Sequence, residues 1–166
     1  MMIKTVLLDK FLHNRNRFDC GIDPLNNYLK NTANQQTQKD NTRTFVLQDP
    51  MENSHIIGFY TLTMVSMDAQ GLPVDLQKKH RFSSAAGLIA RLAVDSRYRG
   101  QGFGEWLLVD ALKKLLYASD MAAFPLIVVD AKEGSGFFYE KYGFTPFHDA
   151  KNKLFITIAD VRISFS

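Results

Sequence analysis

The stretch Arg97–Leu108, RYRGQGFGEWLL, constrains the fold of this chain more than any other. Gly100, Gly102 and Gly104 alternate with other residues just before an apolar, helix-like pattern. Glycine in the first turn of a helix lowers helix stability by about 0.5–1 kcal/mol relative to alanine, so these glycines need another explanation. Strand-like segments flank this unit: LIARLAVD ends at Asp95 before it, and PLIVVDA begins at Pro125 after it. This order of strand, helix and strand predicts a parallel pair formed by residues 88–95 and 125–131.

Hydrophobic periodicity elsewhere predicts a mixed α/β (α+β) fold in a single domain, residues 1–166. Asp23 and Pro24 read as the N-cap and first residue of a helix that runs to about Gln38. The polar stretch Gly71–Ser84 predicts a loop with one helical turn. The other expected elements are strands over Arg43–Leu47, Ile56–Met67 and Leu154–Ile158, a turn over Asp49–Asn53, a helix from the glycines to about Ala118, and an aromatic helix over Gly136–Tyr142 that Gly143 ends.

Composition favours a protein that folds without disulfides or metal. The 13 Phe and 6 Tyr supply a sizeable core, and the single cysteine, Cys20, is expected to be a small buried hydrophobe. The four histidines have no metal-ligand spacing with Cys20, so no metal site is expected. The pattern shows neither a signal peptide nor an apolar run of about 18–20 residues, and we expect a cytoplasmic protein outside the membrane. The net charge of +3 is compatible with a polyanionic partner but does not indicate one.

The glycine-rich start of a helix is suited to binding an anion. Unpaired N–H groups point outward there, the helix dipole favours negative charge, and the lack of Cβ atoms lets a phosphate approach. A Walker loop is excluded because no Lys-Ser or Lys-Thr follows the glycines. A dinucleotide fingerprint would need its third glycine at Glu105, although Asp130 stands where a ribose-binding acid could lie. A tight turn without a ligand is a third alternative.

The residues Arg99–Gly104, RGQGFG, match the R/Q-x-x-G-x-G/A pyrophosphate loop of the GNAT superfamily of N-acetyltransferases at every fixed position. RLAVD before this loop and FYEKYGF after the next strand resemble two later motifs of the superfamily, in the right order and spacing. The resemblance implies the GNAT fold, a mixed and mostly antiparallel sheet with a central, splayed parallel strand pair flanked by helices.

The N-terminal segment resembles the acetyltransferase toxins of bacterial type II toxin–antitoxin systems, which carry an F-x-C-G…L-x-x-[FY]-L…A-x-Q pattern ahead of a strand. The matching residues are Phe18, Cys20, Gly21, Leu25, Tyr28, Leu29, Ala33 and Gln35. The resemblance implies an enzyme that acetylates the α-amine of an aminoacyl-tRNA and blocks translation. It also implies a ribbon-helix-helix antitoxin as partner and a homodimer. The approach KKHRFSSAAGLIARLAVD departs from the proline- and valine-rich approach of many such toxins, which leaves the aminoacyl group open.

The same resemblance implies a site for acetyl-coenzyme A (acetyl-CoA), the acetyl donor. Backbone groups of the strand before the loop would pair with the pantetheine arm, and one amide there would polarise the thioester carbonyl. The loop amides would hold the pyrophosphate, with Arg99 at its rim. Tyr139 would be the general acid that protonates the departing sulfur. The implied coenzyme-binding residues are Leu92, Ala93, Val94, Arg99, Gly100, Gln101, Gly102, Phe103, Gly104 and Ser135.

No residue stands out as a general base, since Asp95 is expected to cap a turn and nothing supports His80. At pH 7 a lysine amine is about 0.04 % neutral, whereas an α-amine is roughly 10–15 % neutral, so a missing base favours an α-amine acceptor. The candidate tRNA contacts are the basic residues Lys78, Lys79, Arg81 and Arg91. Two alternatives stay open: an enzyme for a small amine or a protein N-terminus, and an acyl-CoA-binding regulatory module without turnover.

Overall fold

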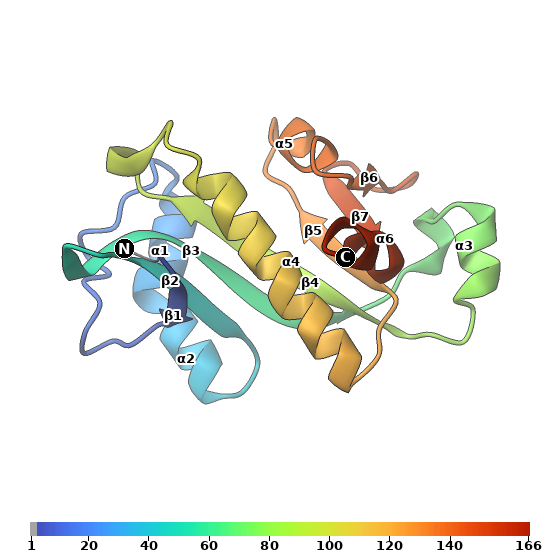
Figure 1. The fold of residues 1–166 in the computed structure, drawn as a ribbon, viewed down its shortest axis with the longest axis horizontal. Helices are drawn as coiled ribbons and strands as arrows, with labels where there is room; N and C mark the ends of the chain where they lie inside the picture. Colours follow the sequence, from blue (N-terminus) through green and yellow to red (C-terminus); the bar gives the residue numbers. More distant parts are fainter. Residues whose placement is uncertain (1–2) are drawn as a thin grey trace. The chain divides into compact units, whose positions relative to one another are not determined.

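The computed structural model describes residues 3–166, and within them hydrogen bonding orders the strands β1-β2-β3-β4-β5-β7-β6 (Figure 1). β4 (Ala85–Val94) and β5 (Leu126–Asp130) are parallel, with Leu88 paired to Val128. The pairs β1–β2, β2–β3, β5–β7 and β6–β7 are antiparallel. The mixed sheet and the parallel pair that the sequence predicts are therefore confirmed.

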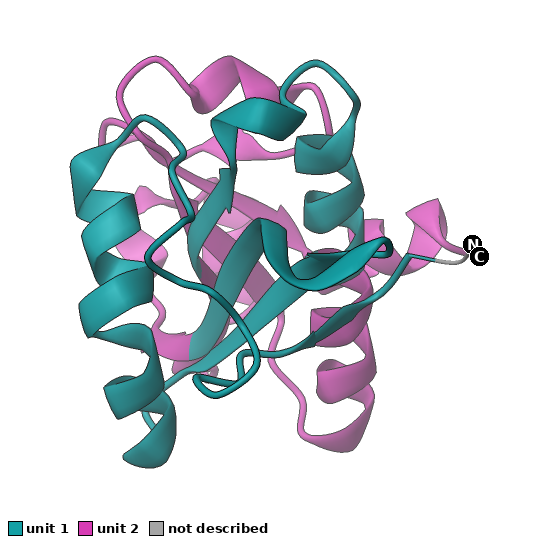
Figure 2. Cartoon of the chain, turned by 90° about the vertical axis from the view of Figure 1, so that its left-hand side faces the viewer, with its two compact units in different colours: residues 1–63, 90–111 teal, residues 64–89, 112–166 magenta. Residues whose placement is uncertain are grey.

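The chain divides into two compact units, each built from two separate stretches of sequence (Figure 2). Unit 1 comprises residues 1–63 and 90–111, and unit 2 comprises residues 64–89 and 112–166. β4 and the long helix α4 (Phe103–Met121) each contribute residues to both units. The single-domain organisation expected from the sequence stays a prediction.

Unit 1 packs helical residues of the N-terminal half against strands. In α1, Leu25, Tyr28 and Leu29 fall on one helical face and are buried. They share an apolar core with residues of β2, β3 and β4, in which the Phe18 and Phe59 rings lie 5.4 Å apart. The elements of this unit are β1 (Thr5–Leu7), α1 (Asp23–Asn31), α2 (Ala33–Gln38), β2 (Arg43–Asp49), β3 (Glu52–Ser66) up to residue 63, the end of β4, the 3₁₀ turn η2 (Ser96–Tyr98) and the start of α4.

Unit 2 is organised around β5, whose first four residues are buried. A continuous apolar run of this kind is typical of a strand covered on both faces. Leu126 and Val128 of β5 share a core with Phe147 and Phe155, whose rings lie 5.1 Å apart. The unit contains the end of β3, the 3₁₀ turn η1 (Ala69–Gly71), α3 (Val74–Lys79), the start of β4, the rest of α4, β5, α5 (Gly136–Glu140), β6 (Thr145–Pro146), β7 (Lys153–Thr157) and α6 (Ile158–Ser164).

The predicted N-terminal helix differs from the structure at its start and in its middle, whereas its end at Gln38 is as predicted. Ile22, not Asp23, is the N-cap, so Asp23 and Pro24 are the first two helical residues. The Asp23 carboxylate then lies in the first turn, where the helix dipole favours negative charge. The helix is also interrupted at Thr32, which has φ −123° and ψ −41°, because the Asn-Thr pair around the break forms helix weakly.

The other differences concern short or marginal elements. The expected turn over Asp49–Asn53 is narrower because β3 already begins at Glu52. The stretch Gly71–Ser84 contains the helix α3, which begins directly after Pro73. The sequence pattern does not predict β1 or β6, which have too few residues to show alternation, nor α6 and its cap by the Thr157 side chain.

Candidate active site

β4 leads into the glycine-rich turn and presents Leu92, Ala93 and Val94 at its end. Ala93 is buried in the core of unit 1, and the other two residues are half-buried. β3 approaches this end closely, since a Cβ on Gly58 would lie 2.7 Å from the Ala93 carbonyl oxygen. Glycine is therefore needed at position 58, and the close packing fixes the strand end from which the turn starts.

The turn itself requires glycine for its backbone conformation. Gly100 and Gly102 adopt φ of +76° and +83°. This is the left-handed region, in which a residue with a Cβ is strained by about 1–2 kcal/mol. A Cβ at either position would meet nothing within 4 Å, so packing within the protein does not explain the two glycines. The space over the turn is open to a ligand that approaches the backbone.

The start of α4 supplies amide donors beside this open space. Gln101 is exposed, and Phe103 and Gly104 are the first two residues of the helix. The Trp106 N–H donates to the Gly102 carbonyl oxygen at 3.0 Å, which begins the helical bonding. The first N–H groups of a helix have no intrahelical acceptor and carry the positive end of the dipole. The structure thus brings the predicted loop residues together in one turn at the start of α4, with the geometry that an anion-binding turn would need.

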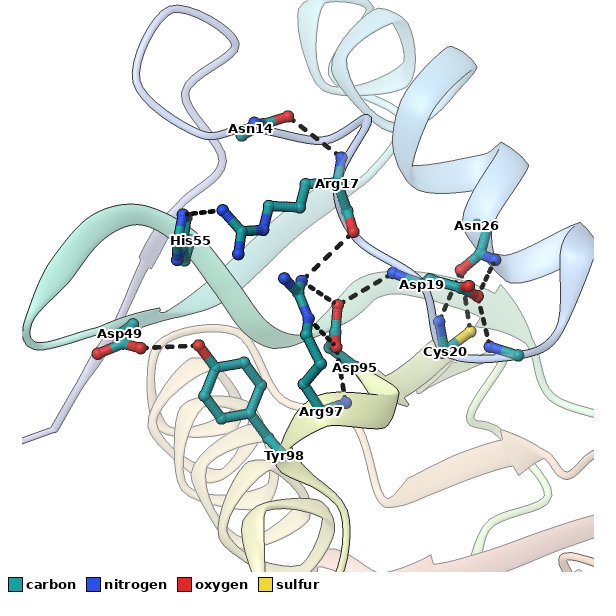
Figure 3. Close-up of polar contacts among 11 residues, drawn as sticks. Asn14, Arg17, Asp19, Cys20, Asn26, Asp49, His55, Asp95, Arg97 and Tyr98 are labelled. Carbon is teal, nitrogen blue, oxygen red and sulfur yellow. Dashed lines mark hydrogen bonds and ion pairs between the residues drawn. The ribbon is translucent and has the colours of Figure 1, made fainter.

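Asp95 closes the turn between β4 and the glycines (Figure 3). Its side chain is 1 % exposed, and its carboxylate accepts from the Arg97 N–H and Nε (2.9 Å each), Arg97 Nη2 (2.7 Å) and the Asp19 N–H (3.0 Å). Burial raises the pKa of Asp95, but these hydrogen bonds outweigh burial and hold the pKa below its usual value. The predicted capping role is confirmed, and a carboxylate engaged in this way is a poor general base.

Arg99 reaches back to the N-terminal segment. Its Nη2 donates to the Cys20 carbonyl oxygen at 2.6 Å, while the residue as a whole is exposed. Cys20 is buried, and its thiol donates to Asn26 Oδ1 at 3.2 Å, which confirms the expected buried cysteine. The contact joins the two motifs that the sequence analysis treats separately. Residues 20 and 99 are too far apart in the sequence for any local pattern to reveal it.

Tyr139 lies in α5 of unit 2 and is 8 % exposed. Its ring makes edge contacts with Phe138 and Phe144, with centroid distances of 5.1 and 5.6 Å. Burial raises the pKa of Tyr139 to about 12, so the phenol keeps its proton at neutral pH. Ser135 is the N-cap residue of α5, and its side chain makes no capping hydrogen bond. Both side chains remain candidates for contact with a substrate.

The predicted tRNA contacts are exposed in the structure: Lys78, Lys79, Arg81 and Arg91. The two lysines lie in the last turn of α3, where positive charge complements the helix dipole. The Arg81 guanidinium lies 4.8 Å from the ring centroid of Phe82, which is 89 % exposed. The sequence pattern does not single out Phe82, yet an exposed aromatic residue inside a basic run is typical of nucleic-acid-binding surfaces. Arg91 belongs to unit 1 and stacks on the Tyr28 ring at 4.4 Å.

The basic end of α3 also lines a cavity of about 480 Å³ in unit 2. Lys79 and His80 contribute to its wall together with Phe124 and Pro125, which precede β5. Burial and the Lys79 charge lower the pKa of His80, so its imidazole is neutral at pH 7. The cavity reaches the start of β5, whereas α5 and Tyr139 follow the end of that strand.

Residues 3–166 contain neither a candidate metal site nor a candidate membrane-spanning helix. No group of three or more His, Cys, Asp or Glu side chains is arranged there to hold a metal ion. No helix in the same range is long and apolar enough to cross a membrane.

The acetyltransferase (GNAT) domain family matches residues 40–146, more than half of the chain. The chain belongs to the GNAT acetyltransferase family. Over 165 residues this acetyltransferase is 30 % identical to a probable toxin TacT of Sinorhizobium fredii, covering 93 % of this chain and 91 % of the relative. Over 114 residues it is 29 % identical to a tRNA-acetylating toxin of Mycobacterium tuberculosis, covering 69 % and 67 %.

Solved structures agree with the family. A tyrosine-to-phenylalanine mutant of KacT superimposes with a TM-score of 0.89 at 26 % identity, covering 99 % of this acetyltransferase and 100 % of KacT. AtaT complexed with acetyl-methionyl-tRNAfMet gives a TM-score of 0.88 at 25 % identity, covering 99 % and 100 %. The GNAT fold and the resemblance to acetyltransferase toxins are confirmed. As a member of this family, the enzyme is an N-acetyltransferase that uses acetyl-CoA.

Proposed function

We propose that this acetyltransferase acetylates the α-amine of an aminoacyl-tRNA and thereby blocks translation. The observation that carries the proposal is the similarity along nearly the whole chain to the probable toxin TacT, at 93 % coverage. The likeness to AtaT, solved with acetyl-methionyl-tRNAfMet, supports the same acceptor class. An N-acetylated aminoacyl-tRNA has no free amine for peptide-bond formation, which is why such a modification stops elongation.

The glycine turn is the proposed binding site of the coenzyme pyrophosphate. The residues fit this group because the backbone at Gly100 and Gly102 is left-handed and the space over both is open. Amides from Gly100 to Gly104 would donate to the phosphate oxygens, and Arg99 would add a positive charge. Backbone groups of Leu92, Ala93 and Val94 would hold the pantetheine arm, with Ser135 as a further contact. One amide of that strand would polarise the thioester carbonyl.

The proposed reaction is direct transfer between donor and acceptor. Attack by the neutral amine on the thioester carbonyl forms the amide C–N bond and breaks the C–S bond. Tyr139 gives its proton to the departing sulfur, and the proton lost by the attacking nitrogen passes to solvent. The phenolate then regains a proton from water. Because the pKa of Tyr139 is raised to about 12, the phenol is protonated at the start of each turnover.

The acceptor amine needs no protein base if it is an α-amine. At pH 7 an α-amine is roughly 10–15 % neutral, against about 0.04 % for a lysine side chain. The carboxylate at the turn, Asp95, is committed to Arg97 and Asp19 and does not serve as a base. The exposed cations at the end of α3 and on β4 would contact phosphates of the tRNA: Lys78, Lys79, Arg81 and Arg91.

The toxin relatives also suggest protein partners. AtaT has been solved in complex with AtaR on DNA, and KacTA has been solved with DNA. We infer that a ribbon-helix-helix antitoxin, encoded beside this gene, neutralises the enzyme, and that the enzyme is a cytoplasmic homodimer. A short ribbon-helix-helix reading frame next to the gene would support the toxin assignment at once.

Labelled acetyl-CoA, incubated with the enzyme and a mixture of charged tRNAs, tests the acceptor. The proposal expects label on at least one charged tRNA and none on the same tRNAs after deacylation. Label on small amines or protein N-termini alone would favour the alternative acceptor, and charge reversal at Lys78, Lys79 and Arg81 would then leave turnover intact. Thermal stabilisation by acetyl-CoA without any transfer would identify a binding module.

A further inference from the structure

The N-terminal segment Arg17–Ile22 is tied to the turn 95–99, which leads into the coenzyme loop (Figure 3). The segment and the turn lie within unit 1 and are joined by backbone and side-chain groups. The hydrogen bonds are Asp19 N–H to Asp95 Oδ2 (3.0 Å), Ser96 N–H to the Asp19 carbonyl oxygen (2.8 Å), Arg97 Nη2 to the Arg17 carbonyl oxygen (3.3 Å) and Arg99 Nη2 to the Cys20 carbonyl oxygen (2.6 Å).

Helix α1 fixes this segment from the other side through Asn26, which is 6 % exposed. Asn26 Oδ1 accepts from the Cys20 N–H at 2.9 Å, and Asn26 Nδ2 donates to Asp19 Oδ1 at 2.9 Å. The Gly21 N–H donates to the same Asp19 oxygen at 2.8 Å. Backbone and side-chain hydrogen bonds from Gly21 and Asn26 hold the pKa of Asp19 below its usual value. The Cys20 carbonyl is therefore presented by a braced loop.

The two arginines of the turn have different electrostatic surroundings. Arg97 forms an ion pair with the buried Asp95 carboxylate at 2.7 Å, so its charge is balanced inside the turn. Arg99 is held by a backbone carbonyl, which is neutral. A neutral acceptor orients the guanidinium without cancelling its charge, and that charge is available to a phosphate. Arg97 thus stabilises the turn, whereas Arg99 is a cation held ready beside the glycines.

Gly21 makes the space that this orientation needs. It has φ +83°, and a Cβ built on it would lie 2.9 Å from Arg99 Nη2. Since Nη2 is the far end of a flexible side chain, a methyl group at position 21 displaces the guanidinium more readily than the backbone. The present position of the Arg99 guanidinium therefore requires that residue 21 has no side chain.

We propose that Gly21 and the Cys20 carbonyl form a seat that orients Arg99 toward the coenzyme pyrophosphate. The F-x-C-G motif at the N-terminus would then be a positioning element of the donor site, and Gly21 a positioning residue. The inference rests on the proposed pyrophosphate site but not on the proposed acceptor, because acetyl-CoA binding is measured without any acceptor.

A double-mutant cycle on acetyl-CoA affinity, measured by titration calorimetry, tests the seat. Loss of the Arg99 contact in Arg99→Ala weakens binding about 10- to 100-fold, as for a lost charge-assisted hydrogen bond. Gly21→Ala is expected to weaken binding by a similar factor. The double variant should bind no more weakly than Arg99→Ala alone, because both changes remove the same contact. A role in folding alone would not produce this non-additivity.

The matched control is Gly143→Ala, which also puts a Cβ at a positive φ (+96°) but meets its nearest atom, Ile156 Cδ1, at 3.5 Å. Its effect should multiply with that of Arg99→Ala. If Gly21→Ala does not fold, the isosteric Asn26→Asp, which repels Asp19 and shifts the segment, replaces it in the cycle. The proposal is wrong if the folded Gly21→Ala variant, or Asn26→Asp in its place, binds acetyl-CoA as tightly as the wild type. It is also wrong if the effects of the two single variants multiply in the double variant. If Arg99→Ala binds acetyl-CoA as tightly as the wild type, Arg99 does not contribute to coenzyme binding, and the proposal is wrong for that reason.

Discussion

Replacing Tyr139 by phenylalanine removes one hydroxyl group and keeps the ring. The contacts to Phe138 and Phe144, at 5.1 and 5.6 Å between centroids, are retained. We therefore expect the urea midpoint at pH 7 and the affinity for acetyl-CoA to stay close to those of the wild type. A fall in turnover then reports on the proton donor and not on folding or donor binding.

Burial of the phenol sets its protonation state. The rise of its pKa from 10.0 to about 12 means that burial disfavours the phenolate by about 3 kcal/mol. At pH 8 only about one phenol in 10⁴ is ionised, so Tyr139 acts as an acid and not as a base. Loss of a general acid lowers turnover by about 10²–10⁴. Release of the coenzyme thiol with a charged tRNA as acceptor measures this fall.

The pH dependence of kcat/KM is a second test of the role of Tyr139. The kcat/KM of the wild type should rise as the α-amine deprotonates, at or below about pH 7.7–8.0 because esterification lowers the pKa of this amine, and should show no falling limb below about pH 10. Because the folded pKa is raised, stability from the neutral phenol is present below pH 10 and lost as the pH rises towards about 12. Turnover of Tyr139→Phe within about threefold of the wild type would refute the assignment, since general acids contribute far more.

The turn, its second glycine and the basic surface give three further tests. Asp95→Asn should lower the free energy of unfolding by about 1–3 kcal/mol in urea at pH 7, because four donors lose a charged acceptor. This difference should begin to shrink as the pH falls below about 4 and disappear as the pH falls through the lowered pKa of Asp95 in the folded protein. Gly102→Ala should cost about 1–2 kcal/mol of stability and weaken acetyl-CoA binding by about tenfold or more in calorimetry. Reversing the charge of Lys78, Lys79 and Arg81 should raise the KM for charged tRNA and flatten its salt dependence, with little change in kcat.

Each of these tests has a contrary outcome. An Asp95→Asn variant as stable as the wild type would mean that the four contacts do not hold the turn. Undiminished coenzyme binding in Gly102→Ala would remove the pyrophosphate from the glycine turn. An unchanged KM for charged tRNA after charge reversal would place the acceptor contacts elsewhere on the surface.

Local sequence patterns predicted the parallel pair and the tight glycine turn before α4 because both follow from short-range chemistry. Alternating glycines allow left-handed backbone, which the structure has at Gly100 and Gly102. The buried run of β5 likewise identifies a central strand. Motif order and spacing then identified the family, which no single motif does. Helix propensity was a less reliable guide to where a helix begins or breaks, as the break between α1 and α2 at Thr32 shows.

The contacts that brace the turn could not be predicted in this way. Asp19 and Asp95 are 76 residues apart, and the Cys20 carbonyl is a backbone group that carries no sequence signature. Their meeting depends on how α1 and β4 share one core. The exposure of Phe82 is also a tertiary property, although its basic neighbours were visible. The acceptor is still harder to predict, because contacts to tRNA phosphates would need only surface charge, which many sequences can supply.

The central claim concerns where the acetyl group ends, and mass spectrometry of the acceptor measures this directly. A mixture of charged tRNAs is incubated with acetyl-CoA and enzyme, then digested with nuclease to release the 3′-terminal aminoacyl-adenosine. We predict that the wild type yields N-acetylaminoacyl-adenosine for at least one amino acid and that Tyr139→Phe yields almost none. Aminoacyl-adenosines without an acetyl group, found while the enzyme acetylates a small amine or a protein N-terminus, would contradict the account.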